Sequence, residues 1–390
     1  MDRLRQNYNS AAGSQTEVLR FAGSGPKEAR GNERLSPIEA FRIPADANRR
    51  GFPSFPSIFV AFLQDLQAST PATLRKIFYF AMKQKQIILV TGATGAQGGS
   101  VARALLDDGT FAVRALTRNP ESEKALALRQ AGVEVVRGDM DDPESLARAM
   151  RGCYGVFGVT SYWEHYDREY RHGKNLIDAV RQSGIRHFIF SSLPGYKKLS
   201  GGALSVPHYD IKAELEDYAR SLHLPATFVQ PASYYENFLN VFMPRPDGDG
   251  NFYFGFPQGD AKLAMVSVED LGGVVSAIFR HPVEYIGRVT GVVGDDRTFP
   301  EYADIMSRVL GRRIYYVYIP HEEYAGLDFP EAEEIANMFE VRRLFIPEQR
   351  VKMIESYALN PSMQTFERWM AKNKDKFAAL LDARLQEAAV

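Results

Sequence analysis

The chain has 390 residues, a formal net charge of −1 and one cysteine, Cys153, and 45% of its residues are hydrophobic. One cysteine excludes an internal disulfide and a cysteine-based metal cluster, and a charge near zero gives no general attraction to nucleic acid or acidic membranes. No apolar run approaches the roughly 18–20 residues that a membrane-spanning helix needs. We therefore expect a globular protein with room for two domains, located in the cytoplasm, with the nucleus left open.

Residues 1–85 differ in composition from the rest of the chain. They contain 13 Lys and Arg against 7 Asp and Glu, a net charge of +6, whereas residues 86–390 contain 34 against 41, a net charge of −7. The segment has no sustained hydrophobic periodicity and is rich in Ser, Ala, Gly, Pro and Asn, as disordered tails are. We expect a disordered tail, or a gene-model extension ahead of a true start at Met82.

The stretch QIILVTGATGAQGG, residues 86–99, predicts the nucleotide-binding element of the chain. An apolar, β-branched run indicates a buried parallel strand, and apolar residues recur at helical spacing from residue 101 onward. Between the two lie Gly92, Gly95 and Gly98. The first glycine permits a tight turn, and the second lets the backbone approach a pyrophosphate. The third allows the helix to pack closely on the strand. This context predicts a dinucleotide-binding loop with an anion at the helix N-terminus.

Strands and helices alternate from this loop to about residue 230. Asn119-Pro120 and Asp142-Pro143 look like helix starts, each with a capping residue and a proline at the first helical position. One long helix is expected over 165–183. The expected strands cover 86–91, 111–117, 133–136, 154–159, 187–190 and 226–230. Six strands with helices between them predict an α/β fold with a doubly wound parallel sheet, the Rossmann, NAD(P)-binding type.

After residue 231 the elements become shorter and mixed. We divide the chain into a nucleotide-binding core, 86–235, and a smaller α+β domain, 236–390, that holds a substrate or a partner. The sequences Ser267-Val-Glu-Asp270 and Thr298-Phe-Pro-Glu301 predict capping boxes at helix starts. The first of these helices, over 267–280, is expected to pack back on the core.

The end of the second strand predicts the cofactor. In dinucleotide folds a carboxylate here binds the ribose 2′-hydroxyl of NAD, and a basic side chain accommodates the 2′-phosphate of NADP. This chain has Arg118 at that place, and no acidic residue follows before Glu121. Because a guanidinium can bind phosphate with two hydrogen bonds, we predict NADP(H) rather than NAD(H). Asp139, which ends the third strand, is either a partner of the adenine amino group or a turn residue.

Several stretches together resemble one known family. They are TGATGAQGGSVARALL, VRALTRNP, VxxGDMDD, VTSYWEH, PASYYENFL and MVSVEDLG. In these motifs the chain resembles the NmrA-like family, atypical members of the short-chain dehydrogenase/reductase superfamily, from residue 86 to about 375. It is most similar to the members proposed as NADPH sensors, and more distantly to the nitrogen-metabolite repressor type.

The resemblance implies roles for residues around the cofactor. It implies Gly92, Thr94, Gly95, Gln97 and Gly98 at the diphosphate, Arg118 at the 2′-phosphate, and Thr160, Lys212, Tyr235 and Asn237 near the nicotinamide. Active members of the superfamily use a Tyr-x-x-x-Lys pair, in which the tyrosine donates the proton. Here Lys212 is in place, but His208 occupies the tyrosine position. Tyr209 lies one residue further on, which turns it by about 100° around a helix.

Two functions therefore stay open. In the first, the chain senses the ratio of NADPH to NADP⁺ and regulates a protein partner without turnover. In the second, it is an atypical NADPH-dependent oxidoreductase acting on a small carbonyl, quinone or enone, with Lys212 or His208 as the acid. Direct nucleic-acid binding is not expected, because the folded part is acidic and no helix carries a basic stripe. No metal site is expected from the scattered histidines, and a homodimer is left open.

Overall fold

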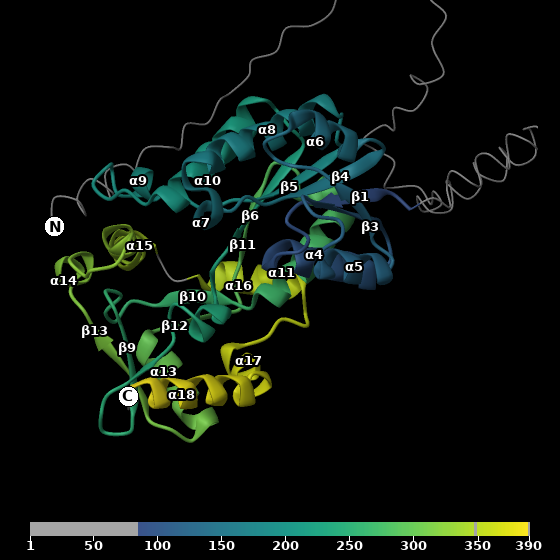
Figure 1. Ribbon diagram of the computed structural model, residues 1–390. Helices are drawn as coiled ribbons and strands as arrows, with labels where there is room; N and C mark the ends of the chain where they lie inside the picture. Colours follow the sequence, from purple (N-terminus) through teal and green to yellow (C-terminus); the bar gives the residue numbers. More distant parts are fainter. Residues whose placement is uncertain (1–84, 347–348, 389–390) are drawn as a thin grey trace, which may run out of the picture. The chain divides into compact units, whose positions relative to one another are not determined.

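The computed structural model describes residues 85–346 and 349–388, so the expectations for the N-terminal segment lie outside the described residues. Residues 85–390 form one compact unit. Its centre is a sheet of seven parallel strands (Figure 1). Their order is β3 (Glu134–Arg137), β2 (Ala112–Thr117), β1 (Ile87–Val90), β4 (Cys153–Gly158), β5 (His187–Ser191), β6 (Ala226–Pro231) and β11 (Val289–Val292). The six predicted strands are present, and the seventh, β11, extends the sheet beyond β6.

The strand order reverses between β1 and β4. In open sheets of this type, ligands bind at such a reversal, in the crevice outside the carboxyl ends of the strands. Helices cover both faces of the sheet (Figure 1). One face carries α4 (Ala96–Asp108), α5 (Glu123–Gln130), α11 (Val268–Arg280) and α16 (Arg350–Leu359), and the other α6 (Pro143–Met150), α8 (Glu169–Gln182) and α10 (Pro207–Ser221). This is the predicted doubly wound Rossmann architecture.

Each face of the sheet has its own hydrophobic core. Ile88 and Val90 of β1 pack with the α4–α11 layer, and Leu89 packs with the α6–α8–α10 layer. Successive side chains of a strand point to opposite faces, so a strand covered on both faces is apolar throughout. This explains the continuous apolar run of β1.

Helix α11 comes from the chain after the six core strands, yet it packs along α4. A Cβ atom on Gly272 would lie 2.3 Å from the carbonyl oxygen of Ser100, so only glycine allows this approach. The Ser100 hydroxyl donates to the carbonyl oxygen of Glu269 (2.7 Å) and accepts from the N–H of Gly272 (3.1 Å). Helix α11 and strand β11 therefore complete the layers of the nucleotide-binding core.

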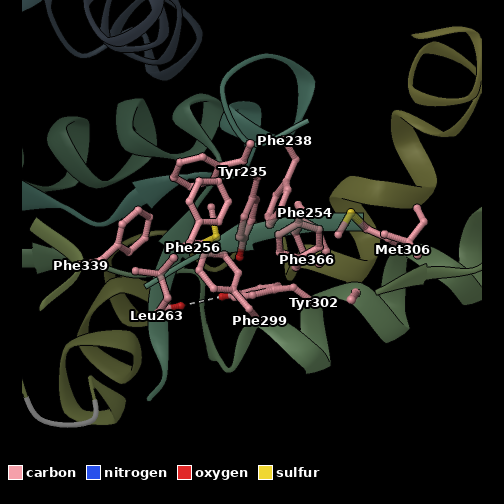
Figure 2. Close-up of a cluster of buried hydrophobic side chains, with 14 of the residues drawn as sticks. Tyr235, Phe238, Phe254, Phe256, Leu263, Phe299, Tyr302, Met306, Phe339 and Phe366 are labelled. Atoms are coloured by element: carbon pink, nitrogen blue, oxygen red, sulfur yellow. Dashed lines mark hydrogen bonds between the residues drawn. The ribbon is translucent and has the colours of Figure 1, made fainter. Parts of the chain in front are cut away.

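The rest of the chain after β6 forms a smaller α+β domain. Its strands make two three-stranded sheets, β12 (Asp295–Arg297)–β10 (Leu263–Val266)–β7 (Ser233–Tyr234) and β13 (Ile314–Tyr318)–β9 (Phe252–Phe256)–β8 (Arg245–Pro246). The core of this domain is aromatic, with Phe238, Phe254 and Phe299 packed together (Figure 2). The buried Tyr302 hydroxyl donates to the carbonyl oxygen of Leu263 (2.9 Å), which satisfies the one polar atom of that ring.

Shorter elements and further helices connect these parts. They are α7 (Tyr162–His165), η2 (Tyr166–Arg168), α9 (Tyr196–Leu199), η3 (Tyr235–Leu239), α12 (Pro282–Tyr285), α13 (Phe299–Leu310), α14 (His321–Ala325), α15 (Ala332–Phe345), α17 (Phe366–Lys372) and α18 (Lys374–Ala388). Among the described helices, none has the length and apolar character needed to cross a membrane.

Two helix starts differ from the predictions. Helix α5 begins at Glu123, where the Ser122 hydroxyl caps it by accepting from the N–H of Ala125, while Asn119 closes a turn onto Glu121. The helix expected over 165–183 is divided into α7, η2 and α8. The break falls at Tyr166, whose positive φ of 31° no helix continues through.

Of the two predicted capping boxes, one is present. Thr298 and Glu301 bond reciprocally at the start of α13. At α11 the Ser267 hydroxyl accepts from the N–H of Glu269 (3.3 Å), and the Glu236 carboxylate accepts from the N–H of Val268 (3.1 Å). The Asp270 carboxylate instead accepts from the backbone N–H of Gln364 (2.8 Å), because the chain leading into α17 passes this helix end.

Candidate functional site

A cleft of about 790 Å³ follows the carboxyl ends of β1 to β4. Its walls are the turn between β1 and α4, the ends of β2 and β3, the loop after β4, and Tyr234 of β7. Eight of the predicted cofactor residues line it: Gly92, Thr94, Gly95, Gln97, Gly98, Arg118, Asp139 and Thr160. The parallel sheet brings these residues together because it places the ends of its strands on one edge.

The turn between β1 and α4 is shaped for a phosphate. Gly92 has a φ of +59°, and a Cβ on Gly98 would lie 2.4 Å from the carbonyl oxygens of Thr91 and Gly92. Gly95 precedes α4, no side chain caps that helix, and its first turn holds no acidic residue. The positive end of the α4 dipole therefore opens into the cleft without a counter-charge.

Opposite charges meet at the end of the cleft formed by β2 and β3. The guanidinium of Arg118 and the carboxylate of Glu164 are 3.8 Å apart, and both side chains are more than half exposed. Asp139 lines the same end, and its carboxylate accepts from the backbone N–H of Asp141 (3.0 Å). Asp139 is thus a turn residue that also presents a carboxylate to the cleft.

Two histidines that the sequence did not single out also line the cleft, His165 and His172. Their rings pack edge to face, with centroids 4.6 Å apart. His172 Nε2 lies 3.0 Å from Asp141, and this contact is the main reason that the pKa of Asp141 lies below its usual value. Burial lowers the pKa of His165, so its ring favours the neutral form.

Lys212 lies behind the cleft lining. Its ammonium donates to Glu169 Oε1 (2.5 Å) and to the hydroxyl and carbonyl oxygens of Thr160 (3.0 and 3.1 Å). Glu169 is fully buried, and within the described chain its second carboxylate oxygen has no hydrogen-bond partner. Lys212 therefore reaches the cleft only through Thr160. Nothing in the sequence pairs Lys212 with Glu169, which lies 43 residues earlier.

His208 is held by a carboxylate from the other domain. Its Nδ1 and its backbone N–H both bind Glu334 Oε1, the latter at 2.9 Å, and the Tyr162 hydroxyl donates to Glu334 Oε2 (3.3 Å). Burial raises the pKa of Glu334, but the hydrogen bonds from His208 outweigh it and leave this pKa below its usual value. The ring of Trp163 packs beside His208, with centroids 5.0 Å apart. His208 is not among the residues that line the cleft.

The structure places Tyr235 and Asn237 away from the cleft lining, contrary to the expectation. Tyr235 begins η3, where the chain turns into the domain, and its buried ring packs against Phe366 (Figure 2). It also packs against Trp369. The preceding residue, Tyr234, lines the cleft instead. Its hydroxyl is buried and has no hydrogen-bond partner in the described part of the chain, and burial raises its pKa.

The fold and the cleft define a protein of the Rossmann, dinucleotide-binding class. The chain belongs to the NmrA-like family, because the model of that family matches residues 84–370. An NmrA-like family domain-containing protein of Dictyostelium discoideum is 33% identical over 246 residues, which cover 61% of this chain and 82% of that protein. The NmrA-like family domain-containing oxidoreductase FrzB of a Cladobotryum species is 34% identical over 277 residues, which cover 65% of this chain and 82% of that protein.

Solved structures agree with the fold. NmrA, a negative transcriptional regulator, is 24% identical in its complex with NAD, with a TM-score of 0.66 and 76% of this chain and 98% of that chain covered. Its complex with NADP gives a TM-score of 0.65 over the same shares. An NADPH-dependent quinone oxidoreductase from Escherichia coli, complexed with NADPH, is 20% identical, with a TM-score of 0.61. The match covers 74% of this chain and 99% of that chain.

Proposed function

We propose that this protein binds NADP(H) in the cleft and acts as a redox-state sensor that regulates a protein partner. The observation that carries the proposal is the state of the two candidate acids. His208 is held by Glu334 and Lys212 by Glu169, and neither side chain lines the cleft. A cofactor-binding cleft without an accessible proton donor at these positions favours binding over turnover.

The cleft residues fit the cofactor in three places. The Gly92–Gly98 turn and the free N-terminus of α4 would hold the diphosphate. Arg118 would bind the 2′-phosphate, and Asp139 lies at the same end for the adenine. The complexes of NmrA with NAD and NADP support the class of ligand. For the choice between NADP(H) and NAD(H), the support is the arginine at the end of β2.

An NADPH-dependent oxidoreductase is the second candidate, favoured by two observations. Relatives such as FrzB are named oxidoreductases, and Tyr234 is a cleft-lining residue whose buried hydroxyl has no hydrogen-bond partner in the described part of the chain. NADPH, when bound, supplies a hydride for such chemistry. In this chain Tyr234 would then hold the proton that the superfamily's usual tyrosine provides.

Calorimetric titration of the full chain with NADPH, NADP⁺ and NADH tests the proposal. A sensor needs NADPH and NADP⁺ to favour different conformational states, because a ligand shifts a conformational equilibrium only by its differential affinity for the two states. We expect both to bind, with a difference in molecular size between the two complexes, weaker binding of NADH, and no NADPH oxidation across a panel of carbonyls, quinones and enones. Turnover that is lost in Tyr234→Phe, or in His208→Ala or Lys212→Ala, would instead establish the oxidoreductase. Equal affinities for NADH and NADPH would contradict the cofactor assignment.

A further inference from the structure

Arg342, on α15, is a buried guanidinium with neutral partners. Its Nε donates to the Tyr196 hydroxyl (3.1 Å), its Nη1 to the Ser233 hydroxyl (2.7 Å) and its Nη2 to the Tyr209 hydroxyl. Arg342 as a whole is only 7% exposed. The rings of Tyr196 and Tyr209, whose hydroxyls both bind the guanidinium, stack with their centroids 4.0 Å apart.

The charge of Arg342 is not balanced by an ion pair. Among the described residues, no carboxylate lies within ion-pair distance of it, whereas the adjacent Arg343 pairs with Glu340 at 2.7 Å. Burying an uncompensated charge is costly, so a guanidinium in this position indicates an anionic partner. Arginine has five N–H donors, and the three hydroxyl bonds leave two of them available.

Arg342 is one of the residues that line a pocket with a volume of about 80 Å³. Its lining includes apolar walls from Leu193, Pro194 and Ile346. Among the described lining residues, Lys352 adds a second cation beside Arg342. A buried guanidinium beside apolar walls suits a small anionic group with an apolar body next to it.

The pocket lies on the same edge of the central sheet as the cofactor cleft. Leu193 follows β5, Ala232 follows β6 and Val293 follows β11, whereas the cleft follows β1 to β4. Strand β7 belongs to both, since Ser233 lines the pocket and Tyr234 lines the cleft. Alternation along a strand explains why adjacent residues serve the two spaces.

We propose that this pocket binds the carboxylate of a small organic acid, with the anion on Arg342 and the apolar body against Leu193, Pro194 and Ile346. A carboxylate matches the planar guanidinium with two parallel hydrogen bonds. The apolar walls favour a carbon-bearing acid over a bare inorganic anion. The site goes beyond cofactor binding and would serve an effector of a sensor or a substrate of an oxidoreductase.

The test uses the full chain and a matched pair of probes, benzoate and benzamide, which have the same shape and differ in charge. In calorimetry we expect benzoate to bind at least about tenfold more tightly than benzamide. Arg342→Met should weaken benzoate binding at least about tenfold, and the control Arg343→Met should leave it within about twofold. NADPH affinity should be unchanged in both variants, which separates this site from the cofactor proposal.

A second variant protects the test if Arg342→Met does not fold. Lys352 is exposed at the pocket, so Lys352→Met is expected to fold and to weaken benzoate binding about threefold, more at low salt than at high salt. Equal binding of benzoate and benzamide, or wild-type benzoate affinity in a folded Arg342→Met, would overturn the proposal. Binding of inorganic phosphate without binding of benzoate would overturn the assignment to a carboxylate.

Discussion

Arg118 and Glu164 occupy the end of the cleft where a 2′-phosphate would lie, 3.8 Å from each other. A phosphate on Arg118 would take the place of the Glu164 carboxylate and be repelled by it. Exposed ion pairs contribute about 0–1 kcal/mol, so this competition is small but measurable. We therefore expect this pair to influence how strongly the protein prefers a phosphorylated ribose.

Glu164→Gln is expected to raise NADPH affinity by up to about fivefold, which corresponds to about 1 kcal/mol. NADH affinity should change less, because that cofactor has no 2′-phosphate. Arg118→Glu should abolish the preference for NADPH. Calorimetric titration of each variant with NADPH and with NADH measures these affinities. Glu121→Gln is the control, since Glu121 pairs with Arg129 outside the cleft lining. Unchanged NADPH affinity in both cleft variants would contradict the placement of the phosphate.

His187 is the residue whose protonation should limit stability in mild acid. It is fully buried at the start of β5, its Nε2 contacts the Thr227 hydroxyl (2.9 Å), and burial lowers its pKa from 6.5 to about 4. The unfolded chain then binds a proton between pH 6.5 and 4 and the folded chain does not. This contribution to stability is complete above pH 6.5 and is lost as the pH falls toward 4.

Urea unfolding at pH 7 and pH 5 measures this effect. The wild type should lose about 2 kcal/mol more than His187→Gln between these values, at about 1.4 kcal/mol per pH unit below 6.5. The exposed His281 offers a control, since His281→Gln should keep the wild-type pH dependence. The same loss in wild type and in His187→Gln would show that His187 is not the group responsible.

At the scale of elements, the contact between α4 and α11 is, among the described glycines, the place where an added Cβ would come closest to a backbone atom. Gly272→Ala would force a methyl group against the backbone of Ser100, which cannot move without shifting α4. We expect a loss of about 1–3 kcal/mol in the free energy of unfolding, measured by urea denaturation. At Gly273 the added atom would meet the end of the Asn360 side chain, which can move without shifting a helix but would weaken its hydrogen bond to the carbonyl oxygen of Asp270 (3.0 Å), so Gly273→Ala should cost less. Equal losses in the two variants would contradict this account.

The elements that could be predicted are those determined by local sequence. The apolar runs gave the six core strands, and the glycine spacing gave the turn that lines the cleft. Strand β11 was missed because it is short and lies among the mixed elements of the second half. The partners of the two candidate acids were missed for another reason. Glu334 lies 126 residues from His208, and only the folded structure brings the two together.

At the scale of the whole molecule, the described residues that line the cleft come from position 92 onward. The family match begins at residue 84 and the compact unit at residue 85. We therefore expect cofactor binding to depend on this unit.

A chain that begins at Met82 should bind NADPH within about twofold of the full chain, because the cleft lining is intact. Parallel calorimetric titrations of the two chains measure this. A loss of more than tenfold in the shorter chain would assign a role in binding to the segment.

The contribution of α11 and β11 to the core has a consequence for biosynthesis. When residue 235 has left the ribosome, the nascent chain has all six predicted strands, but one face of the sheet lacks α11 and the edge of β6 lacks β11. Apolar side chains such as Ile278 and Phe279, which later cover that face, have not yet been synthesised. The core must therefore wait, with an open edge until β11 has been synthesised and with a partly uncovered face until α16, which ends at Leu359, has followed. We expect this interval to be the period when the growing chain most needs a chaperone.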